Sequence, residues 1–156
     1  MNKKVIIISF ICLMIDQLVK FVITTNIALL DSVSVIKSFF SITYVRNYGA
    51  AWSILEGNKI FLIMAAFLSL FLIYFVFIRN NKLNKLEIIT YGVLIGGIVG
   101  NLVDRIIYGY VIDFFDFNIF GYEFPVFNMA DIFIVVSVGL MILNILKEEG
   151  ESWKNI

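Results

Sequence analysis

The sequence predicts an all-α membrane protein with a small β addition, built as one integral membrane domain over residues 1–156. Hydrophobic residues make up 61% of the chain, whereas a soluble domain is usually about 45–50% apolar. Four stretches approach the length of about 20 apolar residues that crosses a bilayer as a helix. The chain has a single proline, which argues against disordered linkers. Together these observations predict four transmembrane helices.

The predicted helices cover about 5–23, 60–78, 86–108 and 127–146, with longer connections at about 24–59 and 109–126. The first helix carries Asp16, Gln17 and Lys20 where a cleaved signal peptide has small residues, so we expect it to be retained. Cys12 is the only cysteine, which excludes an internal disulfide and a multi-cysteine metal site. We expect this residue to be a small buried hydrophobic group.

Basic residues predict the orientation of the chain. Seven of them fall on one side of a four-span protein: Lys3, Lys4, Arg79, Lys82, Lys85, Lys147 and Lys154. The other side has Lys37, Arg46 and Lys59, spread over a longer segment. Because positive charge is retained in the cytoplasm, both termini are predicted to be cytoplasmic and the two longer connections to face outward.

The two outer connections differ in character. Residues 32–38 and 39–46 are rich in β-branched side chains and partly alternate, which predicts two short strands. The second connection holds Phe114, Phe115, Phe117, Phe120, Tyr122 and Phe124. Aromatic residues favour the headgroup zone, so we expect an interfacial aromatic segment, with turns at Gly121 and Pro125.

Polar residues gather in the outer halves of the predicted helices. Asp16 and Lys20 are four residues apart, so they share a helix face and can pair. The third helix carries a polar stripe at helical spacing, formed by Gly97, Asn101, Asp104 or Arg105, and Tyr108. The second helix has no charged residue. Separate segments thus bring polar groups to one depth, a convergence that depends on the predicted helix count and orientation.

Two aspartates are difficult to explain as structural residues. Asp113 lies in the second outer connection, and Asp131 lies about four residues, or about 6 Å, into the fourth helix. An ionisable group at the centre of a membrane helix costs about 2.5–3.5 kcal/mol. Paired aspartates can perform acid–base chemistry on a peptide bond without a metal, and the chain has no histidine. We therefore interpret them as a functional pair.

Structural explanations remain open for the other polar and small residues. Asp16 with Lys20 can be a purely structural ion pair, and the glycines of the third helix can simply permit close helix packing. Asp104 beside Arg105 can fix a helix end, Asn128 can cap the fourth helix, and Asp116 can be a solvated loop charge. Two other classes of function also remain: an ion-coupled transporter or channel subunit, and a non-catalytic scaffold. A transporter favours acids near the midplane or an inverted repeat, and no repeat is visible here.

Five motifs occur in order along the chain: Asp16-Gln-Leu-Val-Lys20, Arg46-Asn-Tyr-Gly-Ala-Ala51, Gly97-Ile-Val-Gly-Asn-Leu-Val-Asp-Arg105, Val111-Ile-Asp-Phe114 and Pro125-Val-Phe-Asn-Met-Ala-Asp131. With them the chain resembles the lipoprotein signal peptidase family, also called signal peptidase II, over nearly its whole length. The resemblance implies four transmembrane helices with an outer β-sheet cradle and an interfacial helix. It also implies a bacterial membrane aspartic protease that cuts prolipoproteins just before a diacylglyceryl-modified cysteine.

The resemblance assigns roles to particular residues. It implies that Asp113 and Asp131 are the catalytic dyad. The other family-typical positions around the site are Asp16, Lys20, Asn47, Gly97, Asn101, Arg105, Asn128 and Ala130. Ile112 and Met129 depart slightly from the family pattern, and neither affects the chemistry.

The resemblance also implies a setting for this activity. No metal or cofactor is expected. The expected partners are the diacylglyceryl-modified prolipoprotein and membrane lipid. Nucleic acid is not an expected partner, since the net charge is zero. We expect a monomer in the bacterial cell (inner) membrane, with the site near the outer surface.

Overall fold

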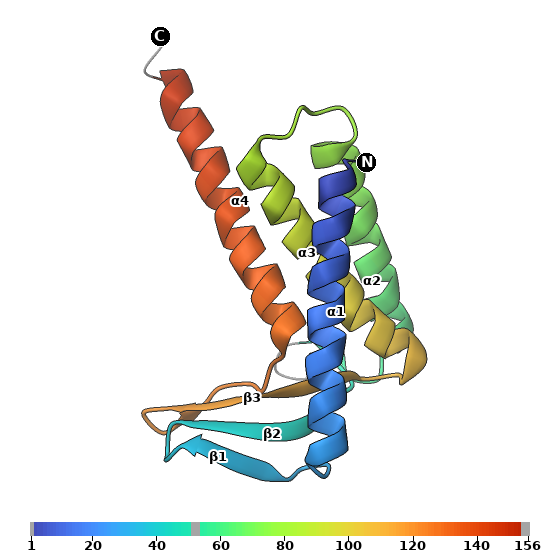
Figure 1. Ribbon diagram of the computed structural model, residues 1–156, viewed down its shortest axis with the longest axis vertical. Coiled ribbons are helices and arrows are strands. Elements are labelled where there is room, and N and C mark those ends of the chain that lie inside the picture. Colours follow the sequence, from blue (N-terminus) through green and yellow to red (C-terminus); the bar gives the residue numbers. More distant parts are fainter. Residues whose placement is uncertain (1, 51–53, 154–156) are drawn as a thin grey trace.

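The computed structural model describes residues 2–50 and 54–153 (Figure 1). Ala51 and Lys154, which entered the motif and orientation predictions, lie outside the described residues. The helices are α1 (Lys3–Asn26), α2 (Lys59–Leu72) continued by the π-helix η2 (Ile73–Ile78), α3 (Lys85–Ile107) and α4 (Met129–Trp153). Within the described residues, four helical segments are long and apolar enough to cross a membrane. The four predicted helices are therefore confirmed.

The predicted helix ends agree within three residues except at the end of α4. That helix continues to Trp153, whereas the sequence predicted its end at about 146. The extra residues are mainly Lys and Glu, which are good helix formers even outside an apolar stretch. α3 begins with a capping box, in which the Asn84 side chain accepts from the N–H of Glu87 and the Glu87 carboxylate accepts from the N–H of Asn84.

Glycines let α3 pack closely against its neighbours. A Cβ atom added at Gly96 would lie 2.8 Å from the backbone oxygen of Ser9 in α1. One added at Gly97 would lie 2.6 Å from the backbone oxygen of Ala130 in α4. The predicted packing role of these glycines is confirmed, and the close approach is the kind that small residues allow between membrane helices. Cys12 is buried beside Gly96, also as predicted.

An antiparallel sheet lies across one end of the helices, opposite the end where α1 begins and α4 ends (Figure 1). Its strands follow the order β1 (Ser32–Ile36), β2 (Phe40–Asn47), β3 (Val111–Ile119) and β4 (Tyr122–Glu123). The two strands predicted in the first connection are confirmed. No interfacial helix, which the resemblance implied, occurs among the described elements.

The second connection forms a strand pair that the sequence did not predict. β3 pairs with β2, and its alternation places Phe115 and Phe117 on one face. The Phe117 ring stacks on Phe40 with centroids 4.5 Å apart. The interpretation of Asp116 as a solvated loop charge was wrong, because this residue lies in β3 and accepts a 2.6 Å hydrogen bond from the Thr43 hydroxyl. The cluster of aromatic residues hid the strand pattern, since aromatic side chains suit both a strand and a headgroup zone.

Candidate active site

Three charged side chains are buried together beside the sheet. The Lys20 ammonium lies 2.9 Å from Asp16 Oδ2 and 2.8 Å from Asp104 Oδ2. Both carboxylates are fully buried. The predicted pairing of Asp16 with Lys20 is confirmed. Asp104 joins them, so that Asp16, Lys20 and Asp104 form a charged triad. The amide nitrogen of Gln17 also lies 2.9 Å from Asp104 Oδ1. Buried charges require such pairing and hydrogen bonding, because each is costly to remove from water.

The two carboxylates of this triad also hold backbone groups. Asp16 Oδ1 accepts a 2.9 Å hydrogen bond from the N–H of Ala130. Asp104 Oδ2 accepts a 3.1 Å hydrogen bond from the N–H of Ile112. Each N–H belongs to the residue immediately before one of the two aspartates interpreted as a functional pair. The triad therefore fixes the backbone at both positions from within the helix bundle.

Asp113 lies on β3 and is 2% exposed. Its Oδ1 accepts from the side-chain amide of Asn128 at 2.6 Å, and its Oδ2 accepts from that of Asn47 at 2.9 Å. Burial, followed by the charge of Asp131, raises the pKa of Asp113 to about 7, against the opposing effect of the two amide hydrogen bonds. A carboxyl group with this pKa can give up or accept a proton near neutral pH.

Asp131 lies in the first turn of α4 and is half-buried. Its Oδ1 accepts from the side-chain amide of Asn101 at 2.7 Å, and its Oδ2 accepts from the N–H of Asn128 at 3.1 Å. The N–H of Asp131 in turn donates to Asn128 Oδ1 at 3.0 Å. The predicted capping role of Asn128 is thus confirmed. Because its amide also reaches Asp113, this one side chain contacts both aspartates.

Both aspartates line a cavity of about 1030 Å³ between α2, α3, α4 and the sheet. The charged and amide groups on its wall are Asn47, Asn101, Arg105, Asp113 and Asp131. Most of the remaining wall is apolar and comes from α2, α3 and α4. The Arg105 guanidinium donates to the carbonyl of Gly49 at 2.9 Å, which ties the segment after β2 to α3.

The structure brings most of the predicted site residues into one hydrogen-bonded network. Its members are Asp16, Lys20, Asn47, Asn101, Asp113, Asn128, Ala130 and Asp131, together with Asp104 and Gln17. Gly97 acts through packing on Ala130, and Arg105 lies in the cavity wall. Sequence reasoning missed the role of Gln17, although its position beside Asp16 on a face with Lys20 was a usable signal. Among the described residues, no group of three His, Cys, Asp or Glu side chains could hold a metal ion.

Comparisons with known proteins identify the family. A family model described as "Signal peptidase (SPase) II" matches residues 8–147. The chain belongs to the signal peptidase II family. Lipoprotein signal peptidases from the Staphylococcus aureus strains JH9 and Newman are each 39% identical to it over 143 residues, which cover 92% of this chain and 88% of each relative.

Solved structures support the same assignment at the level of fold. A bacterial membrane enzyme solved at 2.3 Å resolution superposes with a TM-score of 0.88 at 36% identity, covering 97% of this chain and 92% of that one. A second, solved at 1.9 Å, gives 0.83 at 37% identity, covering 94% and 95%. As a member of the signal peptidase II family, the chain is a multi-pass membrane protease, and its family removes signal peptides from prolipoproteins.

Proposed function

We propose that Asp113 and Asp131 form a catalytic dyad that cleaves a prolipoprotein just before its diacylglyceryl-modified cysteine. The observation that carries the proposal is that both carboxylates line one cavity and both accept from Asn128, that of Asp113 from its side-chain amide and that of Asp131 from its backbone N–H. Two neighbouring carboxyl groups cannot both ionise cheaply, so the pair holds one proton. Because coupled carboxyl groups titrate as a unit, this proton belongs to the pair and not to either residue.

In the proposed reaction, a water molecule binds between the two carboxyl groups. The ionised carboxylate takes a proton from the water, whose oxygen attacks the carbon of the scissile carbonyl. The protonated carboxyl group donates a hydrogen bond to the oxygen that becomes negative. As the C–N bond breaks, a proton from the dyad passes to the departing amine nitrogen. The reaction consumes one water and needs no covalent intermediate.

The surrounding residues support this chemistry by position. Asn47, Asn101 and Asn128 donate to the two carboxylates and leave lone pairs on the carboxylate oxygens for water. Arg105, whose guanidinium binds the Gly49 carbonyl, is placed to hold a substrate backbone together with Asn101. Asp113 comes from a strand and Asp131 from a helix, so entry of the substrate is expected to bring the two carboxyl groups to their reacting distance.

The apolar wall of the cavity is suited to the signal-peptide helix and the acyl chains of the substrate. We infer from the distribution of lysine and arginine that both termini are cytoplasmic and that the sheet faces outward. The site then lies at the outer membrane surface, the depth at which a lipid-anchored cysteine is held. We expect the chain to work as a monomer with one integral membrane domain.

The experiment that tests the dyad compares Asp113→Asn and Asp131→Asn with wild type. Purified protein is incubated in detergent with diacylglyceryl-modified and unmodified precursor side by side. Wild type is expected to cleave only the modified precursor, and each variant is expected to lose cleavage while remaining folded. Asp116→Asn is the matched control, because Asp116 is on the same strand but does not line the cavity. Substantial turnover by either dyad variant would contradict the proposal.

A further inference from the structure

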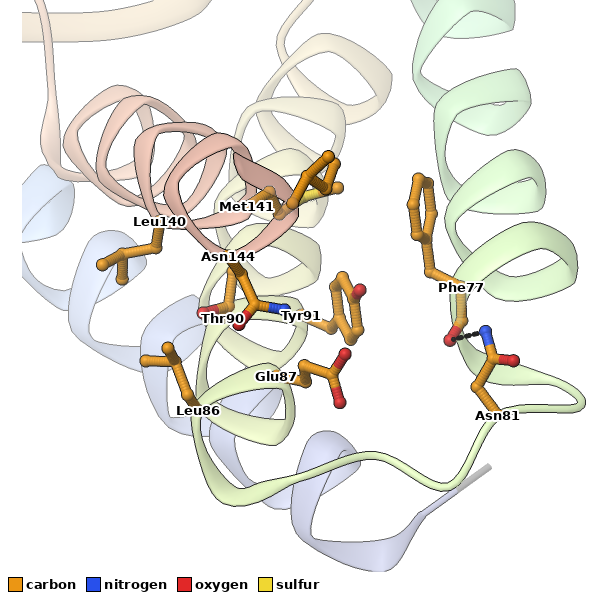
Figure 2. Close-up of a pocket in the computed structure, with 10 residues that line it drawn as sticks. Phe77, Asn81, Leu86, Glu87, Thr90, Tyr91, Leu140, Met141 and Asn144 are labelled. Carbon is orange, nitrogen blue, oxygen red and sulfur yellow. Dashed lines mark hydrogen bonds between the residues drawn. The ribbon is translucent and has the colours of Figure 1, made fainter. Parts of the chain in front are cut away.

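A second, smaller cavity of about 160 Å³ lies at the end of the bundle away from the sheet. Its walls come from the end of η2 and the loop after it, from the first turns of α3, and from the last half of α4 (Figure 2). Figure 2 shows the Glu87 carboxylate pointing into the space between α3 and the segment that carries Phe77 and Asn81. None of the residues that line this smaller cavity belongs to the hydrogen-bonded network around Asp113 and Asp131.

The two cavities adjoin. Phe77, Met141 and Ile145 line both of them, so the apolar groove that begins at the aspartates continues to the smaller cavity. α3 forms the floor of this groove, from Asn101 at one end to Glu87 at the other. These residues are 14 positions apart in one helix, which corresponds to about 21 Å along its axis.

The smaller cavity carries groups that suit a cation. Glu87 Oε2 accepts from the N–H of Asn84 at 2.7 Å, while Oε1 makes no hydrogen bond or ion pair with the described residues. The Thr90 hydroxyl on the same wall is buried and has no hydrogen-bond partner among them. The rings of Phe77 and Tyr91 lie 5.8 Å apart beside it. A carboxylate, a hydroxyl oxygen and aromatic rings together favour an ammonium or guanidinium group.

No lysine or arginine side chain of the described lining provides an ammonium or guanidinium group inside the cavity. The Arg79 guanidinium stacks on the Phe75 ring, 5.1 Å from its centroid, and Arg79 does not line the cavity. The described lining contains no lysine or arginine. With respect to the described part of the chain, the Glu87 carboxylate is therefore available to a positive charge brought by another molecule.

We propose that this cavity is a subsite for the positively charged n-region of the signal peptide. The inference rests on the proposed function, because it assumes that the peptide's apolar segment lies in the groove and that the scissile bond lies at the aspartates. A signal peptide carries its basic residues before an apolar region of about 7–15 residues, which as a helix is about 10–22 Å long. The distance of about 21 Å from Glu87 to Asn101 matches the upper part of that range. Charge and length thus point to the same occupant.

The test combines variants of the enzyme with variants of the precursor and measures cleavage of each combination. It is done in detergent, where no membrane insertion step can select for positive charge. Two synthetic diacylglyceryl-modified precursors differ only in whether two n-region residues are lysine or glutamine. For wild type, we expect kcat/KM to be about fivefold higher with the lysine precursor, the upper end of what an accessible ion pair contributes. Glu87→Gln keeps the oxygen that accepts from Asn84 and is expected to bring this ratio close to one. Glu123→Gln, an exposed glutamate of β4, is the matched control and is expected to keep the wild-type ratio.

The outcomes separate the subsite from the cleavage reaction. Failure of wild type to cleave either precursor would reject the proposed function itself. If wild type cleaves both precursors and Glu87→Gln leaves the ratio of their kcat/KM values unchanged, the subsite alone is rejected. The same holds if Glu87→Gln lowers kcat/KM equally for both precursors. A third precursor with four leucines added to its apolar region moves the lysines about 6 Å beyond the cavity, and its cleavage should no longer depend on Glu87. Continued dependence there would also overturn the proposal.

Discussion

The carboxylate of Asp16 accepts a 2.9 Å hydrogen bond from the backbone N–H of Ala130, the residue that precedes Asp131. This bond joins the first helix to the beginning of the last one. Lys20 pairs in the interior with both Asp16 and Asp104, at 2.9 and 2.8 Å, and Asp104 in turn accepts from the N–H of Ile112, the residue that precedes Asp113. One ammonium group thereby positions backbone at both proposed catalytic aspartates, and this dependence makes its removal informative.

Lys20→Met is expected to destabilise the protein strongly. The change leaves Asp16 and Asp104 buried without a counter-charge, and breaking a buried ion pair in this way typically costs about 3–5 kcal/mol. Thermal unfolding of the detergent-solubilised protein measures the loss. Lys4→Met is the control on the same helix, since Lys4 is exposed. Equal melting temperatures for the two variants would mean that the triad contributes little.

Asn128→Ser separates the two functions of this side chain. Serine is a good N-cap and can still accept from Asp131 N–H, but it is too short to donate to Asp113. We expect a loss of stability of about 1.5–3 kcal/mol, because a buried hydrogen bond to a charged group is removed, together with a fall in kcat of about 10- to 100-fold. Asn118→Ser is the control, because Asn118 lies on β3 and does not line the cavity. Full kcat in Asn128→Ser would show that the hydrogen bond to Asp113 does not contribute to catalysis.

The helices were predictable from the sequence, whereas the partners of the buried charges were predictable only in part. Apolar length fixes a membrane span almost independently of tertiary structure, and the spacing of Asp16 and Lys20 revealed their pairing. The pairing of Lys20 with Asp104 joins residues 84 positions apart, and local spacing carries no signal for such a contact. β3 was missed for a similar reason, because its identity depends on register with β2 and not on its own composition.

The pH dependence of stability follows from Asp113. Burial and the charge of Asp131 raise its pKa from the ordinary 3.8 to about 7 in the folded protein. The folded state therefore binds this proton more tightly than the unfolded chain, and the resulting stabilisation is fully present below about pH 4 and lost as the pH rises through about 7. We expect the melting temperature in detergent to fall by several degrees between pH 5 and pH 8. Asp113→Asn should show a smaller fall, and an equal slope in both proteins would contradict the assignment.

The raised pKa of the Asp113 carboxyl group also predicts an alkaline limit for the activity. If the reaction needs one proton on the dyad, kcat/KM should fall as the pH rises above about 7, the raised pKa of Asp113, because the pair then gives up its shared proton. Initial rates with a diacylglyceryl-modified precursor from pH 5 to 9 measure this limb. A rate that stays constant to pH 9 would mean that the proton is not required.

Gly97→Ala tests whether close packing of α3 on α4 is needed at the site. A Cβ there would lie 2.6 Å from the backbone oxygen of Ala130, so α4 must shift at the residue before Asp131. Overpacking of this kind costs about 1–3 kcal/mol, and we expect both a lower melting temperature and a large loss of cleavage. Gly139→Ala is the matched control within α4, because a Cβ at Gly139 meets nothing within 4 Å. In a helix interior alanine is favoured over glycine by about 1 kcal/mol, so this variant should be as stable as wild type or more so. Equal behaviour of the two variants would mean that the interface can relax without disturbing Asp131.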